Sequence, residues 1–116
     1  MSDHLAILGA SGHGKVIADA ASLNSKWKTI TFFDDAWPNI SGDFTWPVTG
    51  DTDALLEQLS HFSGIVIGIG NNEIRERKHH LLSIHSAPIV SIIHPQSYVS
   101  SLASVGLGTV VLAHAV

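Results

Sequence analysis

The feature that most constrains the fold is a short apolar run that ends in a glycine-rich turn. Residues 5–8 are all apolar, and the run stops at Gly9, so it is too short for a helix. Such a run is typical of a parallel sheet, because helices cover both faces of that sheet and leave no polar side. The next residues, 9–14, read GASGHG and lead into a segment with helical spacing. The sequence therefore predicts a buried strand, a tight turn and a helix.

Three further segments have the composition of strands. Residues 29–33 are β-branched and aromatic, and they end at two aspartates, which favour turns. Residues 65–69 form an apolar run of strand length, and residues 89–93, which are apolar except for Ser91, are the fourth predicted strand. Between the second and third strands, residues 35–50 are rich in Pro, Gly, Asn, Ser and Trp. This composition predicts a long loop with a short extended piece near residues 47–48, placed as a lid.

Helices are predicted between these strands. Asp51 or Thr52 is suited to cap the second helix, and Asn71 or Asn72 the third, because their side chains accept hydrogen bonds from free N–H groups at a helix start. Strands that alternate with helices imply right-handed βαβ units. We therefore predict an α/β fold: a small Rossmann-like, doubly wound parallel sheet with flanking helices. The apolar residues at helical spacing are Val16, Ile17, Ala20, Ala21 and Leu23 in the first helix, Leu55, Leu56 and Leu59 in the second, and Ile74, Leu81 and Leu82 in the third.

The periodicity changes after residue 95. Val99, Val105 and Val111 recur every six residues, with small residues between them. A hexapeptide repeat is the mark of a left-handed parallel β-helix, in which each side of a triangular coil places one aliphatic residue inward. The three hexads make about one coil, which cannot bury its own faces. We predict two units: residues 1–95, and residues 96–116 as the beginning of a truncated β-helix.

Composition excludes several classes of function. The net charge is -4 with only six Lys plus Arg, so the chain lacks the basic surface that nucleic acid or an anionic membrane requires. Cysteine is absent, which excludes disulfides, thiolate catalysis and Cys-ligated zinc, and the histidines show no convincing metal-ligand spacing. There is no export signal and no apolar stretch of about 20 residues. We expect a soluble, cytoplasmic protein without nucleic-acid or membrane partners.

The glycine turn is the first candidate binding site. Glycine lets a backbone approach a ligand closely, and unpaired N–H groups at a helix start attract phosphate. The spacing is G-x-x-G-x-G, whereas dinucleotide enzymes have G-x-G-x-x-G. Ser11 and His13 lie inside the turn, and a neutral, ligand-facing imidazole explains a histidine at the positive end of a helix dipole. A tight strand-to-helix turn without a ligand is the alternative.

Two other turns are candidates. Asp34 and Asp35 follow the second strand about 20 residues after the glycine turn, where a carboxylate commonly accepts hydrogen bonds from a nucleotide ribose or base. Adjacent aspartates are also good turn formers, which is the alternative. Residues 68–75, reading GIGNNEIR, form a glycine-flanked turn or simply an Asn-capped helix start. Because ligands bind outside the carboxyl ends of strands in open α/β sheets, we expect the three turns to converge on one crevice.

Four motifs together resemble one family. They are GASGHG at 9–14, FFDD at 32–35, IGIGNNEIR at 67–75 and IHP at 93–95, just before the hexads. In this order and spacing they resemble the sugar O-/N-acyltransferases related to bacillosamine N-acetyltransferase and sialic acid O-acetyltransferase. The resemblance extends over the whole chain.

The resemblance implies the substrate-binding domain of an acetyl-CoA-dependent acetyltransferase. Its substrate would be a nucleotide-linked amino sugar, with UDP the expected nucleotide, in bacterial glycan biosynthesis. By the same resemblance, Ser11, Gly12 and His13 contact the diphosphate and sugar, Asp34 and Asp35 the uridine, and Gly70 with Asn71 the floor of the pocket.

The resemblance assigns the chemical step to a later segment. The family's general base is a histidine on a later β-helix coil, beyond Val116, and His114 comes too early to match it. No catalytic residue, cofactor or metal site is therefore expected in this chain. Acetyl-CoA is the co-substrate of the family and lies between subunits of a homotrimer. The chain alone is expected to bind the sugar nucleotide without turnover, and to be monomeric or weakly associated.

Two other functions fit part of the same pattern. An NAD(P)-binding oxidoreductase domain would use the same glycine turn. A non-catalytic ligand-sensing domain is the third possibility. The sequence does not distinguish among sugars, or between N- and O-acetylation.

Overall fold

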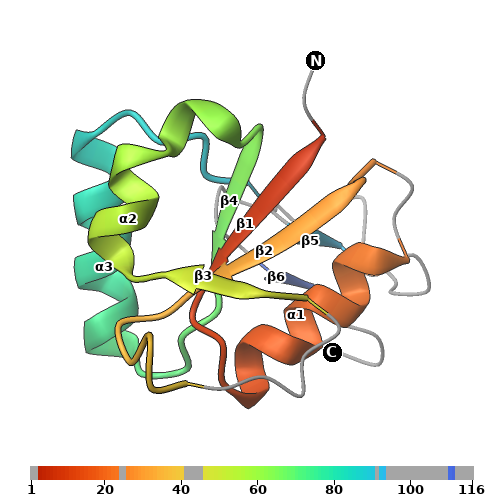
Figure 1. The fold of residues 1–116 in the computed structure, drawn as a ribbon, viewed down its shortest axis with the longest axis horizontal. Coiled ribbons are helices and arrows are strands. Elements are labelled where there is room, and N and C mark those ends of the chain that lie inside the picture. The colour runs from red at the N-terminus through yellow and green to blue at the C-terminus, as the bar shows by residue number, and fades with distance from the viewer. Residues whose placement is uncertain (1–2, 24–25, 41–45, 91, 94–109, 112–116) are drawn as a thin grey trace, which may run out of the picture.

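A parallel four-stranded sheet forms the centre of the computed structural model, which describes residues 3–23, 26–40, 46–90, 92–93 and 110–111. The strand order is β3-β2-β1-β4, and each pair of neighbouring strands is parallel (Figure 1). The predicted parallel sheet is thereby confirmed. The strands are β1 (His4–Leu8), β2 (Thr29–Phe33), β3 (Val48–Gly50) and β4 (Gly64–Ile67).

Helices cover both faces of this sheet. α1 (Gly12–Ser22) lies on one face, and α2 (Thr52–Glu57) and α3 (Asn72–Ile84) lie on the other (Figure 1). A short 3-10 helix, η1 (Leu59–His61), follows α2. Within the described segments, no helix has the length and apolar character that a membrane span requires.

The two-sided burial of β1 explains its uninterrupted apolar run. Successive side chains of a strand point to opposite faces of the sheet. Leu5 and Ile7 pack in the cluster beneath α1, whereas Ala6 and Leu8 pack in the cluster beneath α2 and α3. All four side chains are fully buried. No position among these four faces water, so none is polar.

The order of the strands creates a topological switch point beside β1. From β1 the chain moves to β2 and then β3 on one side, and it next returns to place β4 on the other side of β1. The connections on the two sides of β1 therefore diverge at the carboxyl ends of β1 and β4. In open α/β sheets this divergence leaves a crevice in which ligands bind.

The helix starts agree with the predicted caps. The Asp51 side chain accepts a hydrogen bond from Ala54 N and caps α2, and the Asn71 side chain accepts one from Ile74 N and caps α3.

The predicted apolar face of α1 is wrong at two residues. Val16 is 48% exposed and Leu23 is 61% exposed. The helix buries Ile17, Ala20 and Ala21 as predicted, and it also buries Gly14 and Ala18.

The predicted fourth strand at 89–93 is also wrong as a single element. Ile89 makes only an isolated parallel bridge to Ile65. The chain then leaves the sheet, and β5 (Ile92–Ile93) pairs in parallel with β6 (Val110–Val111) in a separate two-stranded sheet. Apolar residues at 89–93 are compatible with pairing in either sheet, so hydrophobic periodicity alone did not show that the segment divides between the two sheets. Residues 94–109 and 112–116, which hold most of the predicted hexads, lie outside the described residues.

Three glycines bring the turn after β1, the first turn of α1 and the residue after β4 into direct backbone contact. Gly9 has a φ of 114°, and a Cβ there would lie 2.7 Å from the carbonyl oxygen of Gly68. A Cβ on Gly14 would overlap the carbonyl oxygen of Gly9, and one on Gly68 would lie 2.8 Å from the Cα of Gly14. Only glycine fits at these three positions. The close approach also explains why β4 ends at Ile67, two residues before the predicted end.

Replacing Gly14 with alanine tests this contact. We expect Gly14→Ala to lower the free energy of unfolding by about 2 kcal/mol, because the added methyl group meets backbone atoms rather than a movable side chain. Urea unfolding followed by circular dichroism measures the change. Gly12→Ala is the matched control, since a Cβ added at Gly12 would have no other atom within 4 Å, and it should leave stability unchanged or raise it by up to about 1 kcal/mol. Equal effects of the two substitutions would contradict the packing argument.

Candidate functional site

A cleft of about 280 Å³ opens at the carboxyl ends of β1, β2 and β4. All three turns that the sequence singled out contribute to it, and α3 closes one side. A second hollow continues from it along α3 toward Arg77 and Leu81. The cleft is lined by Leu8, Gly9, Ser11, Asp34, Asp35, Ile69, Ile74 and Lys78.

Asp34 ties the glycine turn to the end of β2. One carboxylate oxygen accepts a hydrogen bond from Ala10 N at 2.9 Å, and the other accepts one from Ala36 N at 2.9 Å. The second bond forms a local turn of the kind that aspartate favours. Both oxygens of Asp34 therefore have backbone donors within the protein.

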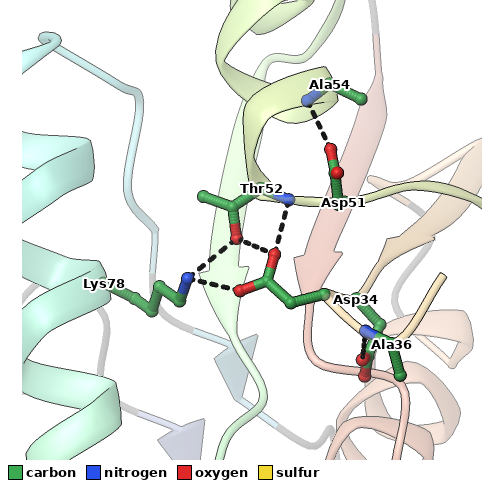
Figure 2. Close-up of polar contacts among 7 residues, drawn as sticks. Asp34, Ala36, Asp51, Thr52, Ala54 and Lys78 are labelled. Carbon is green, nitrogen blue, oxygen red and sulfur yellow. Dashed lines mark hydrogen bonds and ion pairs between the residues drawn. The ribbon is translucent and has the colours of Figure 1, made fainter.

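Asp35 joins the start of α2 to the middle of α3. Its Oδ1 accepts hydrogen bonds from Thr52 N at 2.9 Å and Thr52 Oγ1 at 2.7 Å, and its Oδ2 accepts one from Lys78 Nζ at 2.6 Å. Lys78 also donates to Thr52 Oγ1 at 3.0 Å, which closes a triangle of polar contacts. Figure 2 shows Lys78 reaching from α3 toward Thr52, beside the Asp51 cap of α2. Thr52 is buried, so its polar groups require these partners.

The triangle sets the charge state of Asp35. Partial burial by itself would raise the pKa of this carboxyl, but hydrogen bonds from Lys78 and Thr52 outweigh that effect and lower the pKa below its ordinary 3.8. Asp35 is consequently ionised at neutral pH.

At the start of α1, beside the cleft, the backbone N–H groups of Gly12 and His13 have no acceptor among the described residues. Ser11 is the N-cap of α1, and its side chain makes no capping hydrogen bond. The first turn of the helix has no acidic residue, and Gly12 and His13 are exposed. A helix start of this kind carries partial positive charge and favours an anion.

The predicted site residues divide into two groups. Ser11, Asp34 and Asp35 line the cleft. Gly12, His13, Gly70 and Asn71 do not; they lie in the adjoining turns, and the Asn71 side chain serves as the cap of α3.

Sequence reasoning missed Lys78, together with the apolar residues Ile69 and Ile74. One local signal was available for two of them. Ile74 and Lys78 are four residues apart on a helix, so they lie on the same side of it. Among the described residues, no group of three His, Asp or Glu side chains is arranged to hold a metal ion.

A family model described as the PglD N-terminal domain matches residues 4–82. The chain belongs to this family. The match begins in β1 and ends within α3, so it includes every residue that lines the cleft.

Individual relatives of this PglD N-terminal domain are acetyltransferases by name. UDP-N-acetylbacillosamine N-acetyltransferase of Bacillus subtilis (strain 168) is 31% identical over 112 residues, which are 95% of this chain and 51% of the relative. The acetyltransferase domain of PglB from Neisseria gonorrhoeae FA1090, solved with acetyl coenzyme A, has a TM-score of 0.85 and 34% identity over 97% of this chain and 54% of that one.

A third relative binds a different nucleotide sugar. A mutant of GDP-perosamine N-acetyltransferase from Caulobacter crescentus, solved with CoA and GDP-perosamine, has a TM-score of 0.83 and 26% identity, over 95% of this chain and 51% of that one. The resemblance inferred from the sequence motifs is therefore confirmed. The PglD N-terminal domain described here spans about half the length of the relatives it matches.

The lowered pKa of Asp35 predicts how the stability of this PglD N-terminal domain depends on pH. A carboxyl whose pKa falls on folding stabilises the native state above its unfolded pKa, and the contribution is lost as the pH falls through the folded pKa. Because about half of the side chain is exposed, water screens the effect, and we expect Asp35→Asn to cost no more than about 1 kcal/mol at pH 7.

Urea unfolding at pH 7 and below pH 3.8 measures this dependence. The difference between the parent protein and Asp35→Asn should shrink toward zero at the lower pH. Asp19→Asn, at an exposed position of α1, is the matched control and should change little at either pH. A difference for Asp35→Asn that stayed constant with pH would contradict the role given to its ionised form.

Proposed function

We propose that the cleft binds a nucleotide-linked amino sugar, with a UDP-linked sugar the expected substrate. The observation that carries the proposal is the position of the cleft. It lies at the switch point of a PglD N-terminal domain, between the glycine turn and α3. The names of the relatives support the same class of ligand, since they include acetyltransferases for UDP- and GDP-linked sugars.

The proposed roles follow the charges around the cleft. Ser11, Gly12 and His13 lie at the uncapped start of α1, where the diphosphate and sugar gain hydrogen bonds from backbone N–H groups. Asp34 and Asp35 lie at the nucleoside side of the cleft. Gly70 and Asn71 do not line the cleft itself, and we propose them as the floor under the part of the ligand that extends over the turn after β4.

We assign binding of the nucleotide sugar to this chain. We assign acetyl transfer to the part of the relatives that this chain does not match. In that reaction the amine of the sugar forms a bond to the thioester carbon of acetyl-CoA, the C–S bond breaks so that CoA leaves as its thiolate, and the nitrogen loses a proton to a general base. We place the general base and the acetyl-CoA site outside the described residues. N-acetylation is favoured over O-acetylation because the named relatives are N-acetyltransferases.

The pairing of β5 with β6 supports a β-helix that begins close to the predicted boundary at residue 95, with β5 (Ile92–Ile93) already part of the separate sheet. Ile92 pairs with Val110, and Ile93 with Val111, so each partner follows three six-residue repeats later. One turn of a triangular β-helix with hexapeptide sides has this length. We propose that residues 96–116 are the first coil of such a β-helix, following a binding domain of residues 1–95.

The oxidoreductase alternative has less support. Its basis was the glycine turn alone, and the named relatives are acetyltransferases. A cytoplasmic location stays a prediction.

Calorimetry with a UDP-linked amino sugar tests the proposed ligand. We expect saturable binding to the 116-residue chain and no binding of NADH. Ser11→Phe should abolish sugar-nucleotide binding, because Ser11 lines the cleft and the larger ring fills it, while an exposed position keeps the protein folded. Ser22→Phe, at the exposed other end of α1, is the matched control and should bind normally. Tight NADH binding without sugar-nucleotide binding would reverse the assignment.

The association state is a separate prediction. A single β-helix coil offers little surface for a stable trimer, so we expect residues 1–116 to sediment as a monomer or a weakly associated species. Analytical ultracentrifugation over a range of concentrations measures this. A tight trimer at micromolar concentration would contradict the expectation.

A further inference from the structure

Asp35 and Lys78 place a hydrogen-bond acceptor and a donor side by side on the wall of the cleft. The Oδ2 of Asp35 and the Nζ of Lys78 are 2.6 Å apart, and both residues line the cleft and its continuation along α3. Asp35 Oδ2 accepts a hydrogen bond from Lys78, and an oxygen of this kind has room for a second. Lys78 has three N–H donors, and within the described part of the chain Asp35 and Thr52 occupy two of them.

The charge of this pair makes it a poor site for phosphate. A diphosphate near Lys78 would also lie near the ionised carboxylate of Asp35, whose charge opposes that of the lysine. The start of α1 has no acidic residue in its first turn and is the better site for an anion. The pair is instead suited to a neutral group that has its own donor and acceptor on adjacent atoms.

The apolar residues near the pair indicate a flat ring. Ile69 and Ile74 line the same cleft, and Leu81 lines its continuation. Apolar walls with a few convergent polar groups are the usual surroundings of a bound heterocycle. In a nucleotide-sugar site, the heterocycle is the nucleobase.

We propose that the Asp35–Lys78 pair selects nucleobases with a lactam edge, a ring N–H next to a C=O. This proposal rests on the proposed binding of a nucleotide sugar. The base N–H donates to Asp35 Oδ2, and the base C=O accepts from Lys78 Nζ. Uracil and guanine have this edge, and they are the bases in the substrates named for two relatives. Cytosine and adenine present the reverse, an acceptor nitrogen beside an amino group.

Thr52 acts as a positioning residue for the pair. Its backbone N–H and hydroxyl both donate to Asp35 Oδ1, which prevents the carboxylate from rotating and leaves Oδ2 to Lys78 and the base. Thr52 is only 4% exposed, so it is held by the packing around α2 and does not itself contact a ligand in the cleft.

Comparison of UDP with CDP is the sharpest test, because the two differ only at this edge of the base. If the domain binds a pyrimidine nucleotide, calorimetry should show UDP binding at least about tenfold tighter than CDP. If it binds a purine nucleotide, GDP should bind at least about tenfold tighter than ADP. Lys78→Met should weaken binding of the preferred nucleotide by about tenfold and lower the UDP:CDP or GDP:ADP ratio at least about threefold, because the base C=O loses its donor while Asp35 still accepts from the base N–H. Lys78→Arg keeps a cationic donor and should retain part of the preference.

Lys28→Met is the matched control for the loss of one positive charge. Lys28 precedes β2 at the amino edge of the sheet, is mostly exposed, and pairs with Asp3. It should leave both the affinity and the base preference unchanged. A purely structural role of Lys78 would weaken UDP and CDP equally and leave their ratio intact.

The outcomes separate this proposal from the one on which it rests. Two results overturn the selection by Asp35 and Lys78 while nucleotide binding stands. One is equal binding of UDP and CDP, and of GDP and ADP, by the parent protein; the other is a base preference that is unchanged in Lys78→Met. Binding of none of the four nucleotides and of no sugar nucleotide overturns both proposals. A preference for UDP or GDP that is reduced in Lys78→Met and unchanged in Lys28→Met is the supporting result.

Discussion

The contact among Gly9, Gly14 and Gly68 is the constraint on which the arrangement of the cleft depends. Because these residues have no side chains, the turn after β1, the start of α1 and the end of β4 meet backbone to backbone. A larger residue at any of the three would separate these segments. The close meeting brings the positive end of α1 and one side of α3 to the same opening, so a ligand can touch both.

The two aspartates after β2 connect this opening to the rest of the fold in different ways. Asp34 bonds to backbone donors in the neighbouring turns, whereas Asp35 bonds to side-chain and backbone donors on α2 and α3. The FFDD segment thus contributes two buried aromatic residues to the core and two carboxylates to the cleft. Adjacent residues at the end of one strand therefore contribute both to the packing of the core and to the surface of the cleft.

Much of the fold could be predicted because it depends on local patterns. Residues 29–33 form β2 with the expected bounds, and Asp51 and Asn71 cap helices as their chemistry suggested. The predicted strand at 89–93 was wrong because its partners, Ile65 and Val110, are distant in sequence. Lys78 was missed for the same reason: its partner Asp35 is 43 residues away, and no periodicity connects them. The motifs, taken in order, were sufficient to identify the family. They were not sufficient to predict all the side chains that line the cleft.

The hydrogen bond from Ala10 N to Asp34 has a consequence for the geometry of any anion at this edge. That N–H is the first backbone donor after Gly9, and the carboxylate of Asp34 occupies it. With the donor occupied and a carboxylate beside it, an anion is displaced toward the axis of α1. A ligand with its anionic group at the helix start would therefore reach the rest of the cleft by passing the carboxylate of Asp34.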